Sequence, residues 1–178
     1  MSAQDMKALF KGAKLVDFTG KQAGFVHLKK FDREFVDMLR DCKDGTKAVV
    51  VIDHGFGGRY DSPMVVRDHV NLSGNNPLVG PNNPIGERFP IVQGIYFDDC
   101  LREANRGVVA GLKDNAKPSD EEQQALREIG VDICAYNMVP SMLVAAHAGW
   151  KVLGIVLPEN GSLSTSQIDE LKALTGKN

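Results

Sequence analysis

The sequence has little of what marks secreted, membrane-spanning or disulfide-stabilised proteins. Its three cysteines, Cys42, Cys100 and Cys134, are odd in number and widely spaced, which argues against a disulfide framework and against a CxxC metal site. No apolar run approaches the roughly 20 residues that cross a bilayer. The first residues carry neither the charged segment nor the apolar core of a signal peptide. We therefore expect a protein of a reducing, cytoplasmic compartment with no membrane partner.

Charge clusters and cofactor motifs are also scarce. The net charge is −2 and no basic run is longer than Lys29-Lys30, so nucleic acid is not an expected partner. The pair Gly57-Gly58 lacks the spacing of a dinucleotide fingerprint, and no phosphate-loop motif occurs. No group of His, Cys and Asp has metal-ligand spacing. We expect neither a metal nor an organic cofactor.

What the sequence does have is the pattern of one layered domain. The 178 residues suit a single domain, residues 1–178. Expected strands are 14–18, 22–28 (joined to the first by a turn at Thr19-Gly20), 48–52, 64–70, 107–111, 131–136 and 151–157. Expected helices are 2–10, 31–42, 96–104, 119–129, 140–148 and one starting at Ser164. This alternation predicts an α/β fold of three layers, a mixed twisted sheet flanked by helices.

Two segments have the composition of functional loops. The apolar strand 48–52 runs into Asp53, His54, Gly55, Phe56 and Gly57, where glycine allows a tight turn or a close approach to a ligand. Adjacent Asp and His can do acid/base chemistry, although neighbours on a strand point to opposite faces. Residues 71–90 hold four of the eight prolines, and so long a loop is usually a functional or interface segment.

Residues 67–83 and 86–90 resemble a known family. They read D-H-V-N-L, N-P-L-V-G-P-N and R-F-P, similar to the D-H-I-N-L, N-P-L-x-G-P-N and R-F-P of the trimeric purine nucleoside phosphorylases. Residues 49–58 resemble that family's strand ending in T-N-A-A-G-G, and residues 24–28 loosely resemble G-R-F-H-M. Residues 126–160 resemble its L-G-A-D, V-P-E, A-R-H and L-I-T-N. The chain looks like a shortened and divergent member, similar over residues 24–160.

The resemblance implies a fold, a reaction and an assembly. The family cleaves purine nucleosides with inorganic phosphate as co-substrate, needs no other cofactor and forms homotrimers. Asn160 falls on the asparagine that hydrogen-bonds the purine, although it is also a plausible turn residue before Gly161. Phe89 falls on the phenylalanine that covers a neighbouring subunit's sugar, or is a plain interface or core anchor. His27 falls on a histidine that helps to hold phosphate, or is structural.

The remaining candidate residues lie at strand ends. Asp53 and His54 stand where the family has Thr and Asn, and Tyr136 and Asn137 stand in its M-S-T segment. These residues and Asn160 all follow apolar strands. A parallel arrangement would bring them to one edge of the sheet, so we expect a pocket bounded by residues 54–57, 136–137 and 160.

The departures from the family concern phosphate and base. The family's N-terminal phosphate loop and C-terminal helix are expected to be missing, and its phosphate-binding arginine is Phe25. Its purine-binding glutamate falls near Pro118, and its phosphate-binding hydroxyl is replaced by the Asn137 amide. Three hypotheses stay open: a nucleoside phosphorylase with a reworked phosphate site and weak phosphorolysis, a non-catalytic protein that binds a purine-like ligand, and a nucleoside hydrolase that uses Asp53 or His54.

Overall fold

The computed structural model describes residues 2–82, 86–113 and 116–177. Its helices are α1 (Ala3–Phe10), α2 (Arg33–Arg40), α3 (Asp120–Glu128), α4 (Met138–His147) and α5 (Thr165–Thr175). Its strands are β1 (Lys14–Asp17), β2 (Val26–His27), β3 (Ala48–Phe56), β4 (Met64–Asn71), β5 (Asn105–Gly111), β6 (Ile133–Ala135) and β7 (Lys151–Leu157).

The strands form one mixed sheet that closes on itself. Its order is β2-β1-β3-β6-β5-β4-β7, and β7 also pairs with β3, so that five strands make a ring. β1, β2, β3 and β7 are mutually parallel, whereas β6 runs antiparallel to β3 and β4 antiparallel to β7. β3 is the strand shared by the ring and by the β1–β2 extension.

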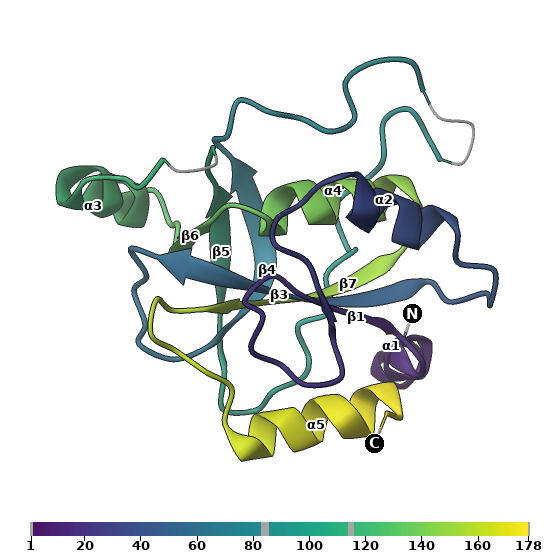
Figure 1. Cartoon of the computed structure of the whole chain (residues 1–178). Helices are drawn as coiled ribbons and strands as arrows, with labels where there is room; N and C mark the ends of the chain where they lie inside the picture. Colours follow the sequence, from purple (N-terminus) through teal and green to yellow (C-terminus); the bar gives the residue numbers. More distant parts are fainter. Residues whose placement is uncertain (1, 83–85, 114–115, 178) are drawn as a thin grey trace.

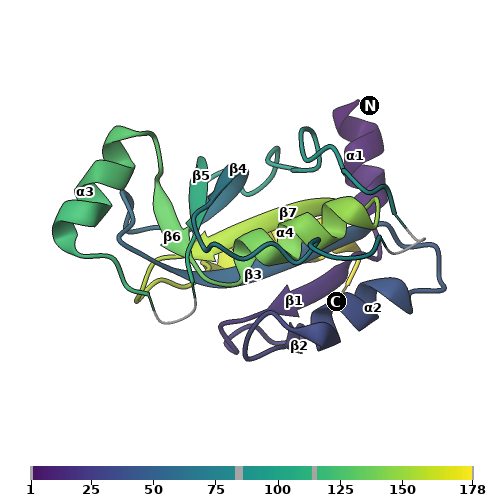
Figure 2. The same ribbon diagram turned by 90° about the horizontal axis from the view of Figure 1, so that it is seen from above.

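Helices cover both faces of this sheet. α2 and α4 pack on one face, and α1 and α5 pack on the other (Figures 1 and 2). The two core clusters on these faces are separate, one around Trp150 and the α4 methionines and the other around Phe10 and Leu153. The expected three-layer α/β fold with a mixed sheet is confirmed.

Strand β3 shows why an unbroken apolar run becomes a central strand. Residues 48–52 are fully buried, as expected for a strand covered on both faces. The strand then continues through Asp53 and His54 to Phe56, beyond the predicted end. A Cβ at Gly55 would lie 2.5 Å from Val156 Cγ1, so only glycine fits where β3 meets β7 and β6.

Three helices begin with the side chains that the sequence predicts. Ser2 with Asp5, Ser119 with Glu122 and Ser164 with Gln167 each form a reciprocal capping box. α3 differs from the other helices because none of its residues is buried. It projects from one end of the molecule (Figure 1).

Two local predictions are wrong. Residues 96–104 are not a helix: the chain there is irregular, with one bridge from Tyr96 to Val152 and a left-handed Leu101 at φ 54°. The expected strand 22–28 is reduced to Val26–His27 and runs parallel to β1, so Thr19-Gly20 is only part of a longer connection. The loop between β1 and β2 is organised by the buried Asp17 carboxylate instead.

The absences inferred from composition can be compared with the described part of the chain. No helix there is long and apolar enough to cross a membrane. The same residues contain no group of three or more His, Cys, Asp and Glu placed to hold a metal ion. Cys42, Cys100 and Cys134 are free thiols.

Candidate functional site

β6 and β7 both pair with β3 near its carboxyl end, where several of the predicted site residues lie. His54 pairs with Leu157 in the parallel β3–β7 ladder, so Asn160 follows β7 three residues beyond that pair. Gly55 pairs with Ala135 in the antiparallel β3–β6 ladder, which brings Asn137 back alongside Asp53. Asn137 therefore lies beside Asp53 through antiparallel pairing of β6 with β3, not through the parallel arrangement that we expected. The pocket bounded by residues 54–57, 136–137 and 160 stays a prediction.

Asp53 is a buried carboxylate whose two oxygens are fully engaged. Its Oδ1 accepts hydrogen bonds from the His54 main-chain N–H at 2.9 Å and from Asn137 Nδ2 at 3.0 Å. Its Oδ2 accepts from the main-chain N–H groups of Asn137 at 2.8 Å and Met138 at 2.9 Å. The last two donors belong to the start of α4, so Asp53 occupies the amino end of that helix.

Burial sets the protonation of this carboxyl group. Loss of solvent raises the pKa of Asp53 to about 6, while the hydrogen bonds from Asn137, His54 and Met138 work in the opposite direction. The side chain is 1% exposed. Asp53 is thus shaped to fix Asn137 and α4 rather than to meet a solvent molecule.

Asn137 is held from both sides. Its Nδ2 donates to Asp53, and its Oδ1 accepts the Phe31 main-chain N–H at 2.8 Å. Its main-chain carbonyl accepts from the Ser141 hydroxyl at 2.8 Å. This amide links β3, α4 and the segment before α2.

His54 is the half-buried titratable side chain at this edge. Its pKa is lowered, first by burial and then by the positive charge of Lys21, while the negative charge of Asp17 raises it. A neutral imidazole at neutral pH can accept as well as donate a proton. Of the candidate pair, His54 is therefore the side chain suited to proton transfer.

His27 lies at the end of β2 beside the same acidic residue. Its Nδ1 is 3.4 Å from Asp17 Oδ2, and its side chain is 48% exposed. Asp17 itself is fully buried and accepts hydrogen bonds from the Thr19 main chain and hydroxyl and from the main-chain N–H groups of Lys21 and Gln22. The sequence analysis missed Asp17, although its place directly after the apolar Leu15-Val16 is the signal that singled out Asp53.

The glycines and aromatic residues complete the edge. Phe56 and Tyr136 lie ring to ring, with centroids 4.7 Å apart at an interplanar angle of 40°. Gly57 adopts a left-handed φ of 64°, and a Cβ there would meet the Gln123 side chain. Gly55 is a packing requirement of the sheet, as described above.

Asn160 and Phe89 are both exposed. Asn160 lies in the turn closed by the Gly161 N–H and the Pro158 carbonyl at 2.7 Å. Phe89 is 82% exposed, and the Arg88 guanidinium lies 5.7 Å from its ring centroid. Phe89 belongs to the loop that runs from β4 toward Tyr96, of which residues 83–85 lie outside the described residues.

Comparison with known proteins identifies the chain's relatives. It is 31% identical over 134 residues to purine nucleoside phosphorylase 1 of Bacillus subtilis, an alignment that covers 66% of this chain and 49% of the relative. It is 34% identical over 114 residues to the Bos taurus purine nucleoside phosphorylase, covering 54% and 39%. The chain spans about half the length of the curated relatives that it matches. No family model matches the sequence.

Solved structures agree with these relatives. A Schistosoma purine nucleoside phosphorylase in complex with hypoxanthine superposes with a TM-score of 0.69 at 20% identity, covering 89% of this chain and 80% of that one. A Schistosoma enzyme in complex with guanosine gives a TM-score of 0.63 at 25% identity, covering 78% and 60%. The first likeness concerns the fold. The chain is therefore similar to purine nucleoside phosphorylases in sequence, over about two thirds of its length, and in fold.

Proposed function

We propose that the chain binds a purine nucleoside or base at the β3–β6–β7 edge and carries out at most weak phosphorolysis with a reworked phosphate site. The observation that carries this proposal is the carboxylate of Asp53 at the amino end of α4. Inorganic phosphate is the co-substrate implied by the family, and no other cofactor is proposed.

The occupied end of α4 weakens phosphate binding for an electrostatic reason. A helix amino end attracts anions through its unpaired N–H groups and its dipole. Here the donors of Asn137 and Met138 are already bound to a carboxylate of the same chain. A phosphate brought to this end would have to displace Asp53 or lie next to a second negative charge.

The position that resembles the family's phosphate-binding hydroxyl is also engaged. The Asn137 side chain donates from Nδ2 to Asp53 and accepts the Phe31 main-chain N–H at Oδ1. Loss of one preorganised donor from a catalytic site typically costs about 10²–10³ in rate. Such losses do not add when residues act as a unit, but even a few of them leave slow turnover.

Groups for the nucleoside itself remain at the edge. His54 offers a neutral imidazole, Asn160 an amide in an exposed turn, and Tyr136 a partly buried ring that packs on the buried Phe56. An amide can donate to and accept from a purine edge. In this proposal Asn160 hydrogen-bonds the base and His54 transfers a proton as acid or base. Asp53 positions Asn137 and α4. His27 and the backbone of Gly55 and Gly57 border the site.

The two alternatives differ in what the surviving groups can do. A nucleoside hydrolase needs a base that reaches water, and the Asp53 oxygens are buried and fully hydrogen-bonded, which leaves His54 for that role. A non-catalytic binding protein needs only the base and sugar contacts. The burial of Asp53 favours the non-catalytic alternative over hydrolysis.

The proposal is tested by incubating the purified chain with inosine, guanosine or adenosine, with and without phosphate, and measuring the free base. We expect slow, phosphate-dependent release, abolished in Asn160→Ala and retained in the control Asn105→Ala, whose amide bonds Ser62 at the amino end of β5. Equal release without phosphate supports a hydrolase, and nucleoside binding with no release supports a non-catalytic protein. Turnover near 10 s⁻¹, about the median for enzymes, would contradict the reworked phosphate site.

Assembly into a homo-oligomer, most simply a trimer, belongs to the same proposal. The loop after β4 presents Val79 at 83%, Phe89 at 82% and Ile91 at 75% exposure, which is costly for large apolar side chains in water. A neighbouring subunit would cover them. Sedimentation of the wild type and of Phe89→Ala tests this: we expect an oligomer that the substitution weakens, and a monomer at high micromolar concentration contradicts it.

A further inference from the structure

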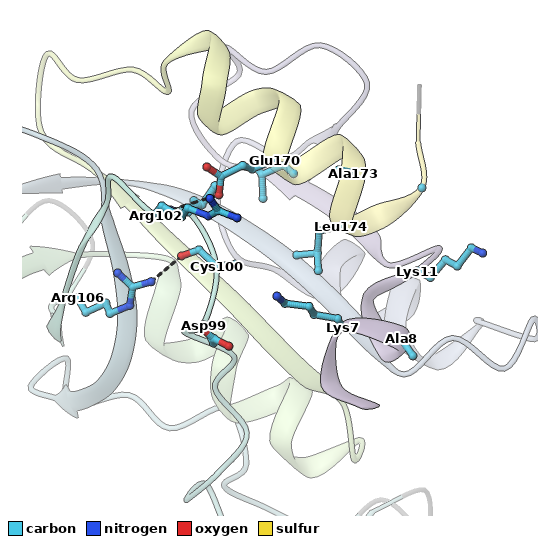
Figure 3. Close-up of a pocket in the computed structure, with 13 residues that line it drawn as sticks. Lys7, Ala8, Lys11, Asp99, Cys100, Arg102, Arg106, Glu170, Ala173 and Leu174 are labelled. Atoms are coloured by element: carbon cyan, nitrogen blue, oxygen red, sulfur yellow. Dashed lines mark hydrogen bonds between the residues drawn. The ribbon is translucent and has the colours of Figure 1, made fainter. Parts of the chain in front are cut away.

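A charged cavity lies on the face of the sheet away from α4, between α1, α5 and the irregular segment before β5. Its volume is about 700 Å³, within the usual range for small-molecule sites. Four cations line it, Lys7, Lys11, Arg102 and Arg106, against two carboxylates, Asp99 and Glu170. We call it the α1–α5 cavity; Figure 3 shows these side chains around it.

Arg106 is a fixed cation at one wall. Its Nε donates to the Asp98 carbonyl at 2.8 Å, and its two terminal nitrogens donate to the carbonyls of Ala104 at 3.1 Å and Cys100 at 2.9 Å. Those acceptors are neutral, so the positive charge has no counter-ion among them. A guanidinium has five donors, and three such bonds leave donors for a ligand.

Arg102 and Lys7 supply cations that are not yet engaged. Within the part of the chain that the structure describes, neither the Arg102 guanidinium nor the Lys7 ammonium has a hydrogen-bond partner. Glu170 accepts instead from the Arg102 main-chain N–H at 3.2 Å. Figure 3 shows Arg102 and Glu170 together at one end of the cavity, Lys11 at the other end and Lys7 between them.

The segment that carries these arginines is strained and rigid. Leu101 is fully buried yet has a left-handed φ of 54°, a conformation that costs a non-glycine residue free energy. The Arg106 hydrogen bonds to residues on both sides of Leu101 hold the segment in this shape. Leu101, Leu171 and Leu174 give the cavity an apolar wall. Burial raises the pKa of the Cys100 thiol to about 12, which favours its protonated form.

The two ends of the cavity differ in their attraction for anions. α1 and α5 both end near Lys11 and Gly176, which line the cavity there, and helix carboxyl ends carry partial negative charge. The opposite end holds two cations, Arg102 and Arg106, against the single carboxylate of Glu170. An anion is therefore favoured at the arginine end, with Lys7 in reach of the middle.

From this arrangement we infer that the α1–α5 cavity binds a phosphorylated small molecule, with its phosphate between Arg102, Arg106 and Lys7 and its apolar part along Leu171 and Leu174. A phosphate monoester carries close to two negative charges near neutral pH and matches the arginine fork. The volume accommodates a ligand of nucleotide size. This binding site is separate from the β3–β6–β7 edge and does not depend on the function proposed there.

Calorimetric titration with AMP, adenosine and inorganic phosphate tests the inference. We expect saturable AMP binding that weakens as salt is added and is much tighter than adenosine binding. Arg102→Ala should weaken AMP binding about tenfold or more, since a charge-assisted hydrogen bond is lost. Arg33→Ala is the matched control, because Arg33 lies on α2 on the opposite face with a side chain 88% exposed. It should leave AMP affinity unchanged.

Chemical-shift mapping keeps the two sites apart. AMP should perturb the amides of residues 99–106 and 170–176, including Leu101. Perturbation confined to residues 53–57 and 160 overturns the inference, as does AMP affinity equal in Arg102→Ala and Arg33→Ala. Adenosine binding as tight as AMP, or no saturable AMP binding at millimolar concentration, also overturns it. Failure of the nucleoside assay described above leaves these outcomes unaffected.

Discussion

The β3–β6–β7 edge and the α1–α5 cavity use charged side chains in opposite ways. Asp53 at the edge and Asp17 at the end of the neighbouring strand β1 are buried, and each accepts four hydrogen bonds from the chain itself. At the cavity, Arg102 and Lys7 face the open volume. A charge that the chain satisfies by itself holds the fold, whereas a charge left facing a cavity is available to a ligand. The family resemblance concerns the β3–β6–β7 edge, whereas the charges left facing open volume, those of Arg102 and Lys7, lie at the α1–α5 cavity.

The largest expected difference between the regions is in stability. Asp53→Ala leaves the N–H groups of His54, Asn137 and Met138 and the Asn137 amide without their acceptor. Each unsatisfied buried donor costs about 1–3 kcal/mol, so we expect the free energy of unfolding to fall by about 4 kcal/mol. Urea denaturation measures it. The control Asp37→Ala removes an exposed carboxylate paired only with Arg33 on α2, and should change stability by less than about 0.5 kcal/mol. Equal losses in both variants would break the comparison.

The next effect is a pH dependence confined to the buried carboxylate. The pKa of Asp53 is raised by burial from 3.8 to about 6, so the folded chain binds this proton more tightly than the unfolded chain does. Its stabilising contribution is therefore complete below about pH 4 and is lost as the pH rises through about 6. We expect the stability of the wild type relative to Asp53→Asn to fall by up to about 3 kcal/mol across that window. Thermal unfolding at several pH values measures it, and a difference that instead grows with rising pH would contradict this sign.

A smaller effect concerns the glycine that lets the edge close. In Gly55→Ala the new methyl group lies 2.5 Å from Val156 Cγ1 and 2.6 Å from Ile133 Cγ1. Overpacking a buried position costs about 2 kcal/mol, which chemical denaturation can measure. Gly58→Ala is the neighbouring control, because its nearest contact is Ile133 Cδ1 at 3.1 Å, the movable end of a side chain. A Gly55→Ala protein as stable as Gly58→Ala would mean that the β3–β6–β7 junction is looser than described.

The smallest expected effect is the change in stability on replacing Arg102, and it distinguishes the two regions most directly. Arg102→Ala should leave the free energy of unfolding within about 0.5 kcal/mol of the wild type, since its guanidinium bonds nothing among the described residues. The same variant should weaken AMP binding. A large loss of stability would mean that Arg102 stabilises the fold, as Asp53 does. The two regions would then use their charged side chains in the same way.

Local patterns in the sequence predicted most of the fold. Capping serines and β-branched runs depend on neighbouring residues, so α1, α3, α5 and β3 could be read directly. Residues 96–104 could not, because their helical appearance is overridden by tertiary contacts: the Tyr96–Val152 bridge and the hydrogen bonds of Arg106. The antiparallel pairing of β6 with β3 could not be predicted either, since three buried residues do not indicate the direction of a strand.

The site was partly predictable for a similar reason. Polar residues after apolar strands identified Asp53, His54 and Asn137, and the structure brings them together. What the sequence could not tell is that Asp53 and Asn137 satisfy one another, because that pairing joins residues 84 positions apart. The α1–α5 cavity gave no signal at all, since Lys7, Arg102 and Glu170 come from three separate segments.

The closure of the sheet on β3 has a consequence for how the chain folds. β3 pairs with β7 along residues 48–54 and 151–157, about one hundred positions later in the sequence. The loop between them must be closed before these contacts stabilise anything, and non-local pairing of this kind makes folding slow. During synthesis β3 therefore keeps an unpaired edge until Leu157 has left the ribosome. A chain stopped before β7 would carry that apolar edge permanently and would be prone to strand-to-strand aggregation.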